Sequence, residues 1–232
     1  MNQEPIKDYN PSTTSEVPAE GRRVEGGSES YPAKLDRHLA KKLMEIKGEI
    51  RGIDLKSDAD FIIKEKGKEG LNKVEEELKE VGYPLEYEKL ETMGFYPGGL
   101  RALSLLVIKK ALNFNDEKIR EMGRYAIKVS FIVKIFIRYF SPISKFFFKE
   151  SPKIWNKYWT AGEFIPVELD EKKKYAIVRV KNLNLHPIYC LYLEGYFSTF
   201  AHLVTGAEEI NIEETKCVFR GDQYHEYLIK WK

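Results

Sequence analysis

Cys190-Leu-Tyr-Leu-Glu-Gly195-Tyr196 begins a segment near the end of the chain from which the rest of the sequence can be interpreted. A mostly apolar run follows to Gly206, and then come Glu214-Thr-Lys-Cys217, Gly221-Asp222 and His225. The segment contains both cysteines of the chain and two of its four histidines. These side chains indicate either a metal site or the edge of a hydrophobic core.

The same segment predicts a helix followed by a hairpin. His186-Pro187 starts a helix that is apolar on most sides, runs to about Val204 and ends at Gly206. Residues 209–220 and 224–231 then read as two strands joined around Gly221-Asp222.

Upstream of this helix, residues 164–169 and 174–180 alternate in polarity and predict two more strands joined by a polar turn. The order of the C-terminal half is therefore strand, strand, helix, strand, strand. We predict an α+β fold in which a helical N-terminal half packs on an antiparallel sheet.

The N-terminal half has helical periodicity in three places, at residues 57–81, 100–112 and 115–140. Ser57-x-x-Asp60 resembles a capping box, and residues 49–55 suit a short strand with a bulge. Ser141-Pro142 and Ser151-Pro152 each look like a helix start, so we expect the helical path to begin again twice.

The composition favours one globular domain with a polar tail. Residues 1–35 lack apolar periodicity and are predicted to be disordered, which leaves 36–232 as a single domain. The formal net charge of the 232 residues is only +2, which gives no support for a nucleic-acid partner. Two cysteines make a disulfide framework improbable and favour a reducing cytoplasm, and the polar N-terminus has no signal-peptide pattern.

The segment from Tyr125 to Trp159 is unusually aromatic. Basic residues interrupt its most apolar part, so no membrane span is expected. The aromatic side chains have three interpretations, which are a hydrophobic core, the wall of an apolar ligand pocket, and a surface or dimer face beside a basic stripe.

The candidate metal ligands are two thiols, one imidazole and one carboxylate, which suit tetrahedral zinc: Cys190, Glu214, Cys217 and His225. Cys217 and His225 meet across the hairpin if its loop has three residues with Gly221 in a left-handed conformation. Glu214 has the opposite strand parity to Cys217, so it joins them only if the strand bulges between the two. Buried free cysteines beside a packed histidine remain the alternative.

The spacing of these residues resembles the C-terminal half of the 4-vinyl reductase-type small-molecule-binding domain. That family's pattern is Cys-x4-Gly-Tyr, then Glu-x-x-Cys, then a Gly and a final Cys, whose place is taken here by His225. The opening from Ile46 to Gly82 also resembles the start of the superfamily, which includes haem nitric-oxide-binding domains and a vesicle-tethering, TRAPP-type branch.

This resemblance implies a cytosolic and often dimeric α+β domain that binds a small apolar or aromatic molecule beside a structural zinc. It implies that Cys190, Glu214, Cys217 and His225 hold the zinc. The Tyr-x-Ser-x-Arg pattern that holds haem propionates in the nitric-oxide sensors is missing from the sequence, so haem is not expected. No ATPase or helix-turn-helix output domain is appended, so direct action on transcription is not expected either.

We therefore expect a sensor or carrier domain with a pocket between the helices of residues 100–159 and the sheet. Four aromatic side chains are the expected apolar walls: Phe131, Tyr139, Trp155 and Trp159. His186 and Tyr189 are the expected polar contacts. The main alternative is a dimeric protein-interaction or scaffold module without a small ligand. An enzyme is the less favoured interpretation, because no nucleophile-base pair or paired-carboxylate motif stands out.

Overall fold

The computed structural model describes residues 35–129 and 144–232, which belong to one compact unit, Lys34–Lys232. The tail predicted to be disordered, residues 1–35, lies outside the described residues except for Leu35. The helical elements are α1 (Arg37–Met44), α2 (Gly52–Glu80), a 3-10 turn (Tyr87–Lys89), α3 (Gly98–Ala111), α4 (Asp116–Val129), α6 (Ser144–Tyr158), α7 (Ile188–Thr205) and a second 3-10 turn (Val218–Arg220). The strands are β1 (Glu49–Arg51), β2 (Phe95–Pro97), β3 (Glu163–Asp170), β4 (Tyr175–Lys181), β5 (Ile210–Lys216) and β6 (His225–Trp231).

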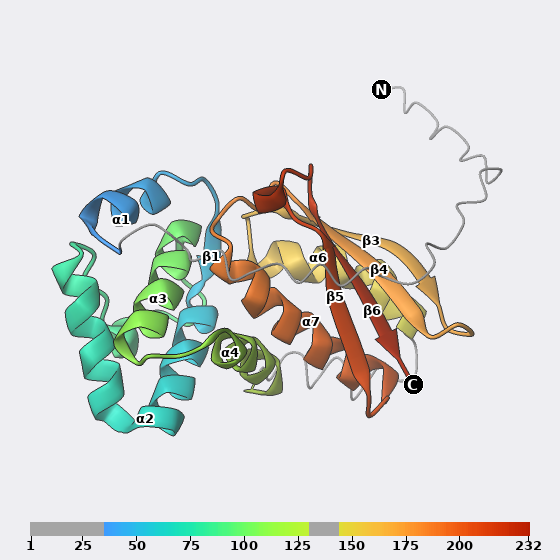
Figure 1. Ribbon diagram of the computed structural model, residues 1–232, viewed down its shortest axis with the longest axis horizontal. Helices are drawn as coiled ribbons and strands as arrows, with labels where there is room; N and C mark the ends of the chain where they lie inside the picture. The colour runs from blue at the N-terminus through green and yellow to red at the C-terminus, as the bar shows by residue number, and fades with distance from the viewer. Residues whose placement is uncertain (1–34, 130–143) are drawn as a thin grey trace. The chain divides into compact units, whose positions relative to one another are not determined.

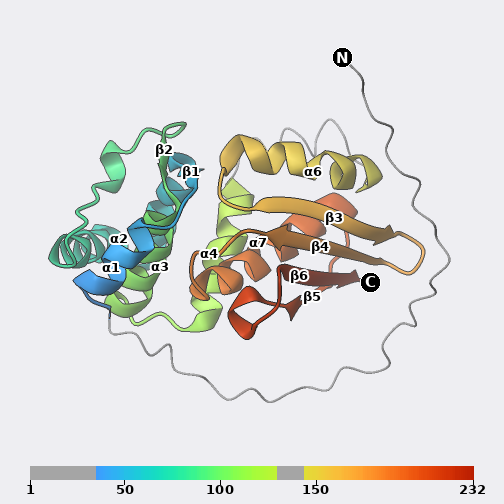
Figure 2. The ribbon, with the colours of Figure 1, turned by 90° about the horizontal axis from the view of Figure 1, so that it is seen from above.

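The predicted α+β class is confirmed, and so is the strand, strand, helix, strand, strand order of the C-terminal half. The four C-terminal strands form an antiparallel sheet in the order β3-β4-β6-β5 (Figure 2). Along β4, Ala176, Val178 and Val180 are buried and alternate with more exposed residues. This alternation gives the sheet one face toward the core, against which α6 and α7 pack.

The start of α2 differs from the prediction. The expected strand over residues 49–55 is only three residues long, and α2 begins at Gly52, ahead of the capping box predicted at Ser57. The backbone N–H groups of Gly52 and Ile53 donate to the carbonyl oxygens of Gly94 and Thr92, at 2.9 and 2.8 Å. The free donors of the first helical turn are therefore satisfied by a distant loop, which local sequence signals do not reveal.

Helix α4 lies between α2 and α7 in Figure 1 and crosses α7 at very short distance. The crossing depends on two glycines, because a Cβ atom at Gly195 would collide with the carbonyl oxygen of Arg120, and one at Gly123 would collide with that of Tyr192. The glycine of the Cys-x4-Gly-Tyr pattern thus has a packing role in this chain. An ion pair between Arg120 and Glu194, with 2.6 Å from Nε to Oε2, accompanies the crossing.

Helix α6 continues through Pro152, contrary to the expected restart at Ser151-Pro152. A proline inside a helix leaves the carbonyl four residues earlier without a donor, which here is the carbonyl of Phe148. The Ser151 hydroxyl donates to that oxygen at 2.7 Å, which compensates for the missing N–H. The other predicted restart, Ser141-Pro142, and the end of the helix predicted to reach residue 140 lie outside the described residues.

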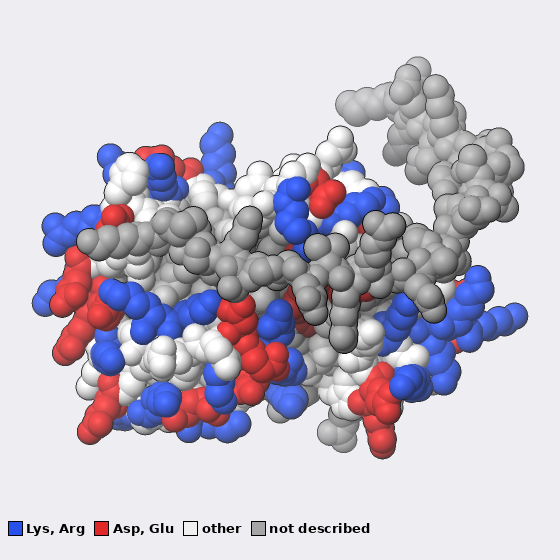
Figure 3. Space-filling model, viewed as in Figure 1, with Lys and Arg blue, Asp and Glu red and all other residues white. Residues whose placement is uncertain are grey.

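Within the part of the chain that the structure describes, no helix is both long and apolar enough to span a bilayer. On the face shown in Figure 3, Lys and Arg side chains lie among Asp and Glu side chains. This mixture agrees with the small net charge of the sequence.

Candidate metal cluster and apolar pocket

Cys190, Glu214, Cys217 and His225 come together in the structure. One potential ligand atom from each lies within 4.8 Å of the others. Cys190 is in the first turn of α7, Glu214 is in β5, Cys217 directly follows β5, and His225 is the first residue of β6. The cluster therefore joins one helix to both strands of the last hairpin.

A bulge in β5 solves the parity problem of Glu214. Glu214 pairs with Tyr227, but Lys216 pairs with Glu226, so Thr215 is the extra residue. In a regular strand, Glu214 and Cys217 would face opposite sides. The extra residue of the bulge turns them toward the same side. Tyr227 supports the carboxylate, since its hydroxyl donates to Oε1 of Glu214 at 3.2 Å.

The hairpin loop is longer than the three residues that we took as the condition for Cys217 and His225 to meet. It occupies residues 217–224 and includes a 3-10 turn, so the strand expected to reach Arg220 ends at Lys216. Gly221 has the predicted left-handed conformation, with φ 95°. The backbone N–H of Cys217 donates to Oδ2 of Asp222 at 2.8 Å, which closes the loop on the cysteine.

The orientation of the His225 ring suits metal binding. Its Nε2 lies 3.0 Å from the carbonyl oxygen of Leu183, which can only accept, so Nε2 carries the proton. Its Nδ1 lies 2.9 Å from Oε1 of Glu214 and 3.6 Å from Sγ of Cys190. A backbone carbonyl on one ring nitrogen is the usual way in which proteins orient a histidine ligand for coordination through the other.

The four side chains form a strongly coupled electrostatic group. Hydrogen bonding with Cys190 lowers the pKa of Cys217 to about 5. Burial opposes a charge on His225, but hydrogen bonds with Cys217 and Glu214 raise its pKa to about 9. Hydrogen bonding to Cys217, together with burial, raises the pKa of the Cys190 thiol. The cluster thus holds negative charge on sulfur and oxygen around one positive ring, an arrangement in which a divalent cation can replace protons.

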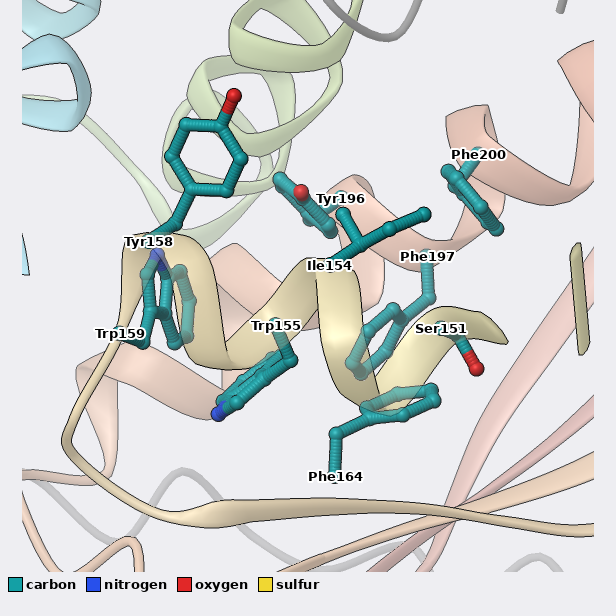
Figure 4. A pocket seen from close by; sticks show the side chains of 9 residues that line it. All are labelled: Ser151, Ile154, Trp155, Tyr158, Trp159, Phe164, Tyr196, Phe197 and Phe200. Atoms are coloured by element: carbon teal, nitrogen blue, oxygen red, sulfur yellow. The ribbon is translucent and has the colours of Figure 1, made fainter. Parts of the chain in front are cut away.

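A second feature is an apolar pocket bounded by α6, β3 and α7. Trp155 and Trp159 line it together with Phe164, Tyr196, Phe197 and Phe200, and it encloses about 450 Å³ including the part open to solvent. Figure 4 shows Tyr158 and Trp159 at one end of this pocket and Phe200 and Ser151 at the other. A neighbouring cavity lies toward the sheet and shares lining residues with it; its volume is about 540 Å³, again including the part open to solvent.

The predicted ligand residues fall in different places. Trp155 and Trp159 line the pocket, whereas Phe131 and Tyr139 lie outside the described residues. His186 precedes α7, where its Nδ1 accepts the backbone N–H of Ile188 at 3.1 Å, and burial lowers its pKa to about 4. Neither His186 nor Tyr189 is among the described residues that line the two cavities, so their contact with a ligand stays a prediction.

Tyr189 instead belongs to a buried ionic cluster between α2, α3 and α7. Arg101 pairs with Asp58, and both side chains are almost fully shielded from solvent. The hydroxyls of Tyr189 and Tyr192 and the Oδ2 atom of Asp54 are buried there, and the Arg101 charge acts on all three groups. Burial raises the pKa of Asp54 to about 6, although the Arg101 charge acts in the opposite direction.

The sequence interpretation missed this ionic cluster and the contribution of α7 to the pocket. The sequence does contain a signal for the ionic cluster, because Arg101 stands among mostly apolar residues in the first half of its helix and Asp54 and Asp58 are one helical turn apart. For the second, the sequence shows that α7 is apolar on most sides, but not which part of its surface faces α6.

Comparison with protein-family models and with curated protein sequences finds no match. Among solved structures, the chain has the fold of H-NOX proteins. An H-NOX protein from S. oneidensis in the Fe(II)NO ligation state aligns with a TM-score of 0.61 at 13% identity, over 79% of this chain and 99% of that one. An oxygen-binding H-NOX domain related to soluble guanylate cyclases aligns with a TM-score of 0.55 at 18% identity, over 79% of this chain and 95% of that one.

H-NOX domains are the haem nitric-oxide-binding domains named above, so the likeness agrees with the fold that the resemblance implies. At these identities it concerns the fold alone.

Proposed function

We propose that this chain is a small-molecule-binding domain of the 4-vinyl reductase type, a sensor or carrier for an apolar or aromatic ligand, with a structural zinc at the Cys-Glu-Cys-His cluster. One observation supports both parts. Helix α7 carries Cys190 at one end and the pocket residues Tyr196, Phe197 and Phe200 further along. Ligand binding in the pocket and the packing of the metal cluster would therefore both depend on the position of α7.

The donor set and its dimensions fit zinc. Zinc bonds of about 2.0–2.3 Å in a tetrahedron place neighbouring ligand atoms roughly 3.3–3.8 Å apart. The two cysteine Sγ atoms are 3.7 Å apart, and Sγ of Cys190 is 3.6 Å from Nδ1 of His225. Nδ1 of His225 and Oε1 of Glu214, at 2.9 Å, are slightly closer than this range.

The zinc would be structural. Four protein donors complete a tetrahedral shell and leave no position for a reactive water. Its effect would be to fasten the β5–β6 loop to the first turn of α7. The described residues thus support a binding function better than a catalytic one.

The pocket does not fit haem, the cofactor that the fold suggests. Haem iron needs an axial ligand such as histidine, cysteine, methionine or a tyrosine phenolate. Of these, the described lining residues include only tyrosines, Tyr158 and Tyr196, and burial raises the pKa of both, which keeps them protonated. The described lining also contains no Lys or Arg to pair with propionates.

Native mass spectrometry with elemental analysis tests the proposal. We expect one zinc per chain in the wild-type protein and in Glu213→Gln, and a loss of zinc in Glu214→Gln. The two glutamates are neighbours in β5, but Glu213 is exposed and does not belong to the cluster. Equal zinc content in both variants would exclude Glu214 as a ligand. A fully folded, zinc-free wild type after purification with zinc would refute the structural metal.

The same measurement addresses the partner. A co-purified molecule of a few hundred daltons that is lost in denaturing conditions is the expected result for a carrier. The homodimer implied by the resemblance stays a prediction, and light scattering tests it. A dimer that never takes up a small molecule would favour the alternative, a protein-interaction or scaffold module.

A further inference from the structure

The apolar pocket and the neighbouring cavity adjoin each other, and we treat them as two lobes of one site. Both are lined by the same four side chains where they meet: Ser151, Phe164, Phe197 and Phe200. We call the part beyond them toward Trp155 and Trp159 the aromatic lobe. The part toward the sheet is the aliphatic lobe.

The aromatic lobe has flat walls. The ring centroids of Trp155 and Trp159 are 4.0 Å apart, and Trp155 stacks on Phe164 with 5.5 Å between centroids and 26° between planes. Trp159 also contacts Tyr196, at 6.2 Å. Side chains arranged in this way favour another flat ring, through stacked or edge-to-face contacts.

The aliphatic lobe has a different lining. Beyond the four shared side chains, Phe148 and Trp231 contribute rings to it, but most of the remaining wall is saturated: Leu169, Ala176, Val178, Ala201, Val204 and Ile229. Val178 and Ile229 come from the inner face of the sheet, and Ala201 and Val204 come from α7. The saturated part of this wall can make many close van der Waals contacts with a saturated chain.

Among the described residues, neither lobe has a partner for a charged group. No Lys, Arg, Asp, Glu or His is among the described residues that line them. The indole N–H of Trp155 is already donated to the carbonyl oxygen of Gly162 at 3.3 Å. An ionised group would have to leave water without compensation, which is strongly unfavourable.

From this division we propose that the ligand is an uncharged molecule with a flat unsaturated ring at one end and a saturated chain at the other. The ring lies in the aromatic lobe and the chain in the aliphatic lobe. The inference rests on the proposed small-molecule function and specifies its ligand class. It also assigns discrimination by chain length to the wall formed by Val178, Ala201 and Val204.

Calorimetric titration with benzyl alcohol and its 4-ethyl, 4-butyl and 4-hexyl derivatives tests the inference. These probes are neutral and differ only in chain length. Each buried methylene contributes about 0.8 kcal/mol, so affinity should rise about fourfold per methylene until the lobe is full.

Two matched variants separate the lobes. Val204 and Ile154 are half-buried aliphatic residues on helices, and each lines one lobe only. Val204→Trp should retain the wild-type affinity for benzyl alcohol within about twofold and lose the rise with chain length. Ile154→Trp should weaken every probe by a similar factor. If Val204→Trp fails to fold, Ala201→Leu fills the same lobe with a smaller change.

The outcomes separate the ligand class from the small-molecule function. A wild type that binds benzyl alcohol with no gain from the chain overturns the two-lobe inference and leaves the small-molecule function standing. A Val204→Trp variant that keeps the full rise with chain length also overturns the two-lobe inference alone. A wild type that binds no member of the series at one site per chain overturns both.

Discussion

Replacing Asp54 by Asn should make this protein more stable at neutral pH and remove part of the pH dependence of its stability. Oδ2 of Asp54 is shielded from solvent, and interactions of this carboxyl with Arg101 and with the Trp159 side chain do not offset the cost of its burial. Burial raises the pKa of this carboxyl from 3.8 to about 6 in the folded protein. The ionised form is therefore disfavoured in the folded chain relative to the unfolded one.

The direction in which stability changes with pH follows from proton binding at Asp54. Between pH 4 and 6 the folded protein retains a proton at Asp54 that the unfolded chain has already lost, so the free energy of unfolding falls as pH rises. One pKa unit corresponds to about 1.36 kcal/mol, so a rise in the pKa of Asp54 from 3.8 to about 6 corresponds to a loss of about 3 kcal/mol in the free energy of unfolding once the carboxyl is ionised. Asn imitates the neutral carboxyl, so at pH 7.5 the variant should be more stable than the wild type by up to about 3 kcal/mol. At pH 4 the two should be nearly equal.

Several other ionisable groups surround Asp54: Asp58 on α2, Arg101 on α3, Tyr158 on α6, and Tyr189, Tyr192 and Tyr196 on α7. Burial raises the pKa of each of these four tyrosines, so they stay neutral between pH 4 and 7.5. Titrations elsewhere, including those of the metal cluster, cancel when variant and wild type are compared at each pH.

Urea unfolding followed by circular dichroism at pH 4, 5, 6 and 7.5 measures this difference. Asp60→Asn is the matched control, because Asp60 is an exposed aspartate on the same helix, and it should change stability by less than about 0.5 kcal/mol at every pH. A difference between Asp54→Asn and wild type that stays constant from pH 4 to 7.5 would refute the reasoning. A variant that is less stable at pH 7.5 would show that attraction to Arg101 outweighs the cost of burial.

Three further predictions concern the rest of the core and the metal cluster. Arg101→Met should lower the free energy of unfolding by about 3–5 kcal/mol in urea titrations, because it leaves Asp58 buried and unpaired, and the double change with Asp58→Leu should recover much of that loss. Gly195→Ala should destabilise by about 1–3 kcal/mol in the same assay, because the new Cβ collides with the backbone of Arg120, and no loss would show that α4 and α7 separate easily. Zinc at about 100 times its dissociation constant should stabilise the wild type by about 2.7 kcal/mol, or raise Tm by about 5–10 °C in differential scanning fluorimetry. Cys217→Ser should lose this gain, and a gain that survives in the variant would place the zinc elsewhere.

Much of the fold follows from local patterns in the sequence. The alternation of apolar side chains over residues 174–180 predicts a strand, and β4 occupies Tyr175–Lys181. The apolar run of residues 186–204 predicts a helix ended by Gly206, and α7 runs from Ile188 to Thr205 with Gly206 in a left-handed conformation. Both patterns are determined by which neighbouring residues share a face, and a linear sequence records that directly.

The predictions are wrong where a residue distant in the sequence, or an unexpected side chain, supplies a hydrogen bond that the backbone of a helix requires. Helix α2 starts at Gly52 because residues 92–94 accept its first N–H groups, and α6 passes Pro152 because the Ser151 hydroxyl replaces the missing donor. Periodicity carries no information about such partners. Residue types indicated the candidate ligand set, spacing left open whether its members meet, and the resemblance to a known domain strengthened it.

By itself, the sequence determined the kind of chemistry available: two thiols, an imidazole and a carboxylate near the end of an α+β chain, and an aromatic segment before its sheet. Only the tertiary structure decided that these groups meet. A bulge at Thr215 and a long loop before His225 bring the side chains of Glu214, Cys217 and His225 to the same side. The packing of α6 and α7 on the sheet leaves two adjoining apolar cavities. The physical reason is that side-chain chemistry and local periodicity are properties of neighbouring residues, whereas a distance such as 3.7 Å between the sulfur atoms of Cys190 and Cys217 depends on how the whole core packs.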